Sequence, residues 1–134
     1  IKVFGNQKLK VALSLEKVDG NGYEFIDAPE CIPQDENPRS VIEGYHSSSM
    51  KRAIEAVKNK EADVIVSGGG TGPLVTLSRH ILGTVNSVRP ALCARIPAGP
   101  NKFSFMVDLG ANASSTASDL YDFARLGNAA YKAF

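Results

Sequence analysis

The chain has 134 residues, of which 43% are hydrophobic and 22% charged, a composition that favours one globular domain over residues 1–134. Fifteen Lys and Arg residues nearly balance fourteen Asp and Glu residues, and the net charge of +1 argues against nucleic acid as a partner. The two cysteines lack a C-x-x-C spacing, and no long apolar run or signal peptide is visible, so we expect a soluble cytoplasmic protein. Because the chain opens at Ile1, inside an expected strand, we also expect it to belong to a longer protein.

The first part of the chain alternates strands and helices. The expected elements are a strand over 1–4, a weak helix through Leu9, Leu13 and Leu15, a turn over 19–22, a strand over 23–26 and an exposed connection over 28–37. A helix should follow, with Asn37 as its cap and Pro38 at its first position.

Three consecutive serines, residues 47–49, precede the next helix. Its apolar positions have the spacing i, i+3, i+4, i+7 of an amphipathic helix: Met50, Ala53, Ile54 and Val57. Capping needs only one serine, so the spare hydroxyls favour a second helix start that binds an anion.

The central stretch is SGGGTGP, residues 67–73, between a β-branched run at 62–66 and an apolar helical pattern at 74–82. We expect a buried parallel strand, a glycine turn, and a helix with Pro73 at its first position. Four glycines would let a ligand approach the backbone, and N–H groups at a helix start favour phosphate or an oxyanion. The hydroxyls of Ser67 and Thr71 would add donors. A bare tight turn that uses glycine only for its geometry is the alternative.

The second half predicts a strand over 91–96, a turn over 97–101 and a strand over 103–109, and the short link favours antiparallel pairing of the two strands. After residues 114–116 a last helix carries Leu120, Phe123, Ala124 and Gly127 on one face. Since ligands bind at the carboxyl ends of strands in open α/β sheets, the exits after Val66 and Leu109 should wall one site.

The sequence has two histidines, His46 and His80, and no Cys-His cluster with metal-ligand spacing. We therefore expect no metal, and His80 should complement the C-terminus of the 74–82 helix. Without a Gly-x-Ser-x-Gly elbow or a Ser-His-Asp pattern, a covalent nucleophile is not indicated.

Five motifs occur in a recognisable order: SSM at 48–50, SGGGTG at 67–72, RPAL at 89–92, DLGAN at 108–112 and FARLG at 123–127. Over residues 37–131 the chain thereby resembles the phosphate acyltransferase PlsX family of fatty acid and phospholipid synthesis. The resemblance implies a three-layer α/β sandwich related to isocitrate and isopropylmalate dehydrogenases, with a mostly parallel sheet that would be truncated here. It also implies attack of inorganic phosphate on acyl-acyl-carrier protein, no cofactor, a homodimer and peripheral membrane association.

The resemblance and the residues together predict a phosphate site. Its cradle would be Gly69, Gly70, Thr71 and Gly72, with further hydroxyl donors from Ser48 and Ser49. Asn112 would hold phosphate or the acyl carbonyl through its amide, so Asn112 and Thr71 are the expected catalytic residues. If His46 faces this site, phosphate binding should strengthen below about pH 6.5.

Two other interpretations stay open. The family usually has an asparagine where this chain has Gly70, and a basic approach where it has Glu43, which favours a non-catalytic or fragmentary module that binds phosphate or acyl-carrier protein. In the other interpretation the chain keeps only the fold. In any of these cases we expect this chain alone to have little turnover, and we expect a dimer contact on the last helix through Leu120, Phe123 and Tyr131.

Overall fold

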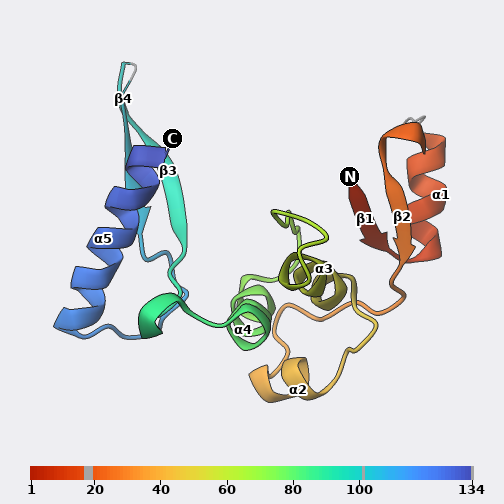
Figure 1. Cartoon of the computed structure of the whole chain (residues 1–134), viewed down its shortest axis with the longest axis horizontal. Helices are drawn as coiled ribbons and strands as arrows, with labels where there is room; N and C mark the ends of the chain where they lie inside the picture. The colour runs from red at the N-terminus through yellow and green to blue at the C-terminus, as the bar shows by residue number, and fades with distance from the viewer. Residues whose placement is uncertain (17–19, 101, 134) are drawn as a thin grey trace. The chain divides into compact units, whose positions relative to one another are not determined.

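The computed structural model describes residues 1–16, 20–100 and 102–133, which form an α/β protein (Figure 1). The chain divides into two compact units, Ile1–Gly83 and Thr84–Phe134. The first unit contains β1 (Lys2–Gly5), α1 (Gln7–Leu15), a 3₁₀ turn (Gly20–Gly22), β2 (Glu24–Asp27), α2 (Pro38–Glu43), α3 (Ser49–Lys58) and α4 (Thr71–Leu82).

β1 and β2 form a parallel pair whose register runs from Lys2 opposite Glu24 to Gly5 opposite Asp27. The connection contains α1, as parallel strands require, and the Asn6 side chain caps this helix by accepting the Leu9 N–H at 3.1 Å. Both predicted strands and the weak helix are confirmed. Of the predicted turn at 19–22, Asp19 lies outside the described residues.

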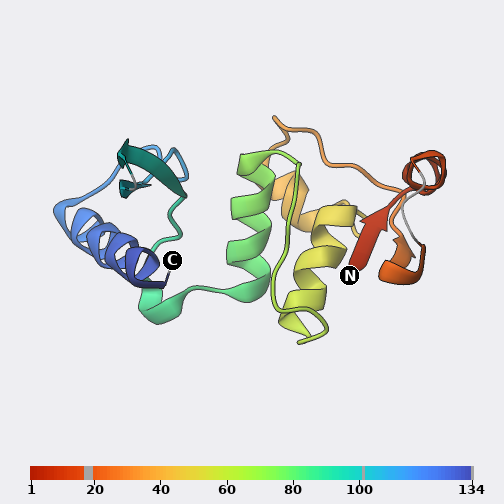
Figure 2. The ribbon, with the colours of Figure 1, turned by 90° about the horizontal axis from the view of Figure 1, so that it is seen from above.

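The core of the first unit lies among α2, α3 and α4, where Val41, Ile54 and Leu77 are fully buried. The caps expected from sequence are present: the Asn37 side chain accepts from Arg39 N–H, with Pro38 at the first position of α2, and Ser48 caps α3. α3 and α4 pack side by side and run in the same direction, and the chain between them returns along the pair (Figure 2). Both helices therefore begin at the same end of the unit.

The strand predicted at 62–66 is wrong. This segment is extended but pairs with no strand among the described residues, and the side chains of Val64 and Val66 are 74% and 96% exposed. Its composition favours a strand, but a strand is completed only by a hydrogen-bonded neighbour. Only Ile65 packs on the core, and a 2.6 Å ion pair from Lys2 Nζ to Glu61 Oε2 holds the chain just before the segment.

α4 also begins earlier than the apolar pattern indicated. Thr71 is its first residue, so Pro73 occupies the third helical position and not the first. The helix tolerates proline there because the N–H groups of the first turn have no intrahelical acceptor.

The second unit is a β-hairpin covered by one helix. β3 (Cys93–Gly99) and β4 (Lys102–Val107) pair antiparallel, as predicted, from Cys93 opposite Val107 to Gly99 opposite Lys102, and α5 (Ala117–Ala133) packs on β4 (Figure 1). β3 continues to Gly99, through most of the predicted 97–101 turn, and Asn101 lies outside the described residues. On the predicted face of α5, Phe123 is buried.

The α/β class is thus confirmed, but the expected mostly parallel sheet is not observed. Each unit has a two-stranded sheet of its own, one parallel and one antiparallel. Without pairing at 62–66, the parallel sheet stops at β1 and β2. The three-layer relationship to the dehydrogenases stays a prediction.

Candidate functional site

The start of α4 leaves backbone donors open. Gly70 is the N-cap residue, with φ −61° and ψ 138°, and it has no side chain that could cap the helix. Within the described part of the chain no acceptor pairs with the N–H of Thr71 or Gly72, and both residues are exposed. Leu74 N–H already donates to Gly70 O at 3.1 Å. Two amides with partial positive charge therefore face solvent at this helix start.

At the start of α3, which lies at the same end of the unit, most of the N–H groups already have protein acceptors (Figure 2). Ser48 is fully buried, and its Oγ accepts the Lys51 N–H at 3.3 Å. The N–H of Ser47 donates to the Glu30 carboxylate at 2.5 Å, and the N–H of Ser49 donates to Glu30 O at 3.4 Å. Phosphate therefore has no direct access to the Ser48 hydroxyl, and the half-buried Ser49 is the more accessible of the two predicted donors.

The four glycines of the loop have two different functions. A Cβ at Gly70 would come within 2.9 Å of Gln34 Cα, and one at Gly69 within 2.5 Å of Met50 Cε, so these positions serve close packing. At Gly68 and Gly72 a Cβ would meet nothing within 4 Å. Only these two glycines leave open space beside the backbone, and Gly72 also carries one of the two open amides.

His46 is exposed and pairs with a cation. Lys51 Nζ lies 3.2 Å from His46 Nδ1 and also donates to Ile42 O at 3.4 Å. An ammonium can only donate, so Nδ1 is the acceptor in this pair. Lys51 is not among the residues predicted for the site, although its i, i+3 spacing to the buried Ile54 indicates the core side of α3. Lys51 is only 9% exposed.

In the second unit, Asp108 and Asn112 form a closed network of hydrogen bonds. The carboxylate of Asp108 accepts from the backbone N–H groups of Leu92, Ala111 and Asn112 at 2.9, 3.1 and 2.9 Å. It also accepts from Asn112 Nδ2 at 2.8 Å, and Nδ2 donates a second bond to Pro90 O at 2.8 Å. Partial burial opposes ionisation of Asp108, but these hydrogen bonds outweigh it and lower its pKa below 3.8.

The RPAL and DLGAN motifs are thereby joined, and a further contact links them to α5. Arg89 Nη1 donates to Ser114 O at 3.0 Å and to Asp119 Oδ2 at 3.1 Å. Asp119 also accepts from Thr116 N–H and Oγ1, each at 2.8 Å, bonds that lower its pKa. Gly110 has φ +89°, a conformation for which glycine is suited.

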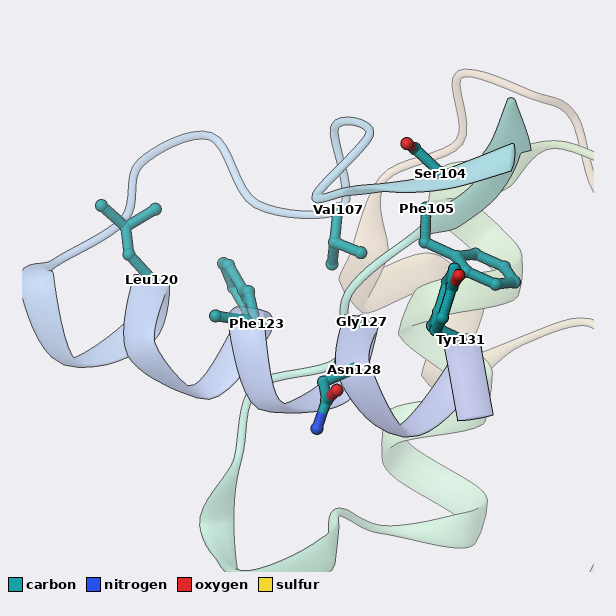
Figure 3. A pocket seen from close by; sticks show the side chains of 9 residues that line it. Ser104, Phe105, Val107, Leu120, Phe123, Gly127, Asn128 and Tyr131 are labelled. Atoms are coloured by element: carbon teal, nitrogen blue, oxygen red, sulfur yellow. The ribbon is translucent and has the colours of Figure 1, made fainter. Parts of the chain in front are cut away.

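A groove of about 440 Å³ lies between β4 and α5 (Figure 3). Val107 points from the strand towards Phe123 and Gly127 of the helix, and Phe105 and Tyr131 line the groove at one end. A second hollow in the first unit, of about 380 Å³, is lined by Lys51, Glu55, Lys58, Asn59, His80 and Ile81. His80 lies in the last turn of α4, as predicted. Neither hollow contains a residue of the predicted phosphate site.

The predicted site residues fall into both units. Ser48, Ser49 and the glycine loop lie together in the first unit, where Met50 contacts the loop at Gly69, and Asn112 belongs to the second. That the exits after Val66 and Leu109 wall one site stays a prediction. Among the described residues, no three His, Cys, Asp or Glu side chains gather as a metal would require.

Comparison with known proteins decides the family. The family model for the fatty acid synthesis protein matches residues 1–133. The chain belongs to this family. It is 39% identical over 110 residues to the phosphate acyltransferase of Ehrlichia canis, which covers 81% of this chain and 33% of the relative.

Two other phosphate acyltransferases are identical to this chain to a similar degree. The phosphate acyltransferase of Vibrio parahaemolyticus is 41% identical over 106 residues, covering 78% of this chain and 31% of the relative. That of Lactococcus lactis is 39% identical over 111 residues, covering 82% and 34%. The chain thus spans about a third of the length of these relatives. In the described part of the chain, no helix combines the length and apolarity needed to cross a bilayer.

Proposed function

We propose that the chain contributes to a phosphate acyltransferase that converts acyl-acyl-carrier protein and inorganic phosphate into acyl phosphate and free carrier. A phosphate oxygen attacks the thioester carbon, the C–S bond breaks, and the carrier thiolate leaves and takes up a proton. Such a reaction needs a positioned nucleophile and donors for the developing oxyanion, and it needs no protein nucleophile. Family membership and the names of the relatives support this assignment.

The observation that carries the proposal is the unequal pair of helix starts in the first unit. At the start of α3 the N–H groups of Ser49 and Lys51 have protein acceptors and Met50 is buried. The exposed Thr71 and Gly72, by contrast, have N–H groups without an acceptor among the described residues. A helix start with free amides and open space beside Gly72 suits a tetrahedral anion. Phosphate held there would have Thr71 Oγ1 as a further donor.

Titration of the ¹⁵N-labelled chain with phosphate tests this site. The backbone resonances of Thr71 and Gly72 should shift in a saturable manner, while those of Lys51, whose N–H is already capped, should shift much less. Absence of saturable shifts at residues 71 and 72 would remove the phosphate site, and with it this route to the function.

A second candidate is a module that binds phosphate or acyl-carrier protein without turnover. The contact of Gly70 with the backbone of Gln34 favours it, because no asparagine side chain fits at this position without a shift of that backbone. Phosphate-dependent release of free carrier by this chain would exclude the non-catalytic module. Saturable phosphate binding without release of carrier by this chain would favour the module, or a site that other parts of the protein complete.

We further propose a cytoplasmic homodimer with peripheral membrane association as the working form. Leu120 and Tyr131 on α5 are 60% and 54% exposed and suit a contact, whereas Phe123 is 2% exposed and packs within its own unit. Light scattering at high concentration tests the dimer, which a mass of one chain would exclude. Flotation with vesicles tests the membrane association.

A further inference from the structure

The orientation of the Asn112 side chain determines which of its atoms a ligand can meet. Nδ2 lies 2.8 Å from both Pro90 O and Asp108 Oδ2, and these two atoms are acceptors. The amide therefore cannot be turned round, since its oxygen would then face a carbonyl and a carboxylate. An NH₂ group has two hydrogens, so both donors of Asn112 are committed inside the protein.

The remaining polar atom of Asn112 is its carbonyl oxygen. No group of the described residues donates to Oδ1, and this oxygen is not among the buried atoms that lack a partner. Because Asn112 as a whole is half-buried, Oδ1 reaches solvent from a side chain that three groups hold in place: its own backbone N–H on Asp108, and Nδ2 on Asp108 and on Pro90. A preorganised acceptor is the result.

We infer that Asn112 binds a hydrogen-bond donor of the substrates through Oδ1, and not an anion or a carbonyl through its NH₂ group. The identity of the ligand rests on the proposed function, whose substrates offer two kinds of hydrogen-bond donor. One is the P–O–H of protonated phosphate. The other is an amide N–H of the pantetheine arm that carries the acyl group. The inference revises the donor role expected for Asn112 from sequence, and makes Asp108 a positioning residue.

The first test is internal to the protein and needs no ligand. If both hydrogens of Asn112 Nδ2 are bonded, its side-chain NH₂ resonances should exchange with solvent at least about tenfold more slowly than those of the exposed Asn128 on α5. Exchange as fast as that of Asn128 would overturn the inference.

The second test compares ligands on the ¹⁵N-labelled chain at pH 7. Sulfate and phosphate have the same shape, but only phosphate retains an O–H donor, and pantetheine offers amide donors without an anion. The affinity for phosphate or for pantetheine, measured from the shifts of the Asn112 resonances, should be about fivefold higher than that for sulfate. This is the factor that the loss of one hydrogen bond implies. Because phosphate and pantetheine are titrated separately, the ligand that shifts the Asn112 resonances identifies the source of the donor.

These outcomes separate the inference from the proposed function. Both anions should shift Thr71 and Gly72, since those amides need only an acceptor. Shifts there, with no response of Asn112 to phosphate or pantetheine, would leave the phosphate site intact and refute the acceptor role. An equal response of Asn112 to sulfate and phosphate would also refute it.

The variant Asp108→Ala tests the positioning. It removes the carboxylate oxygen that accepts from Asn112 Nδ2, so the Asn112 side chain should no longer be held and the preference for phosphate or pantetheine over sulfate should fall to near unity. Unchanged resonances of α5 would show that the unit still folds. A folded variant that keeps the full preference would refute the positioning role, and if the variant does not fold, the titration of the unaltered chain still decides the acceptor role.

Discussion

Met50 fills the space beside Gly69. Its terminal methyl group lies where a side chain at position 69 would begin, 2.5 Å from the ideal Cβ position. The contact joins the first turn of α3 to the glycine loop, and Met50 itself is buried in the core of the first unit. The loop is therefore supported by the core on one side, while Gly72 stays open.

The first prediction concerns Gly70. The variant Gly70→Ala would place a Cβ 2.9 Å from Gln34 Cα and 3.3 Å from Gln34 O, and because these are backbone atoms the loop must shift. We expect a loss of about 1–3 kcal/mol in the free energy of unfolding, measured by urea denaturation. The matched control Gly68→Ala, which meets nothing within 4 Å, should be nearly neutral. Equal stabilities of the two variants would contradict the packing role of Gly70.

The second prediction separates binding from stability at Gly72. A branched side chain in Gly72→Val would shield the amides of residues 71 and 72 but has free space in the protein. Phosphate binding should weaken at least about tenfold in an NMR titration, while stability stays equal or rises slightly, because glycine is a poor helix former. Gly68→Val, outside the helix, is the control and should bind phosphate nearly as before. Undiminished binding by Gly72→Val would place the anion elsewhere.

The third prediction concerns Glu30, whose carboxylate accepts from Ser47 N–H at the end of the unit where α4 begins. Glu30→Gln keeps an acceptor and removes a negative charge that repels an incoming phosphate. Affinity for phosphate should rise about two- to fivefold at low salt, and this gain should shrink at high ionic strength. The control is Glu55→Gln, which removes the same charge further along α3. An equal gain in phosphate affinity in both variants would show that the change in net charge, and not the position of Glu30, is the cause.

Local signals predicted much of this fold. Asn37 and Pro38 predict the start of α2, because capping and a proline at the first helical position act within one turn of the helix. Ser48 predicts the start of α3 for the same reason. The spacing of Met50 and Ile54 gives the buried face of α3 for the same reason.

Features that depend on distant partners could not be predicted in this way. Val64 and Val66 have strand-forming side chains, but pairing is decided by a neighbouring strand. The site shows the same division: the open amides at Thr71 follow from the glycine loop, whereas the orientation of Asn112 depends on Pro90, 22 residues away.

The fourth prediction concerns acid stability. The pKa of Asp108 is lower in the folded chain than its ordinary value of 3.8. The ionised carboxylate therefore contributes to the free energy of unfolding in full above about pH 4, and this contribution is lost as the pH falls through the pKa of the folded state. The midpoint of thermal unfolding should therefore drop between pH 5 and pH 3. In Asp108→Asn the drop should be smaller, and stability at pH 7 should be lower.

The control for this pH series is Asp122→Asn on α5, since Asp122 contacts Arg125 at 3.6 Å near the surface. It should retain the pH dependence of the unaltered chain. If Asp108→Asn lost as much stability between pH 5 and pH 3 as the unaltered chain does, the acid response would have to come from other carboxylates, such as Asp119.

The extended segment at 62–66 has a consequence for how this chain behaves in concentrated solution. Its valines are exposed, and its backbone forms no ladder with another strand of the described residues, so a second polypeptide can hydrogen-bond to it edge to edge. Short β-branched segments of low charge are also those that stack into fibrils. Within this segment Asp63 alone carries a charge, so this single carboxylate is the gatekeeper against aggregation.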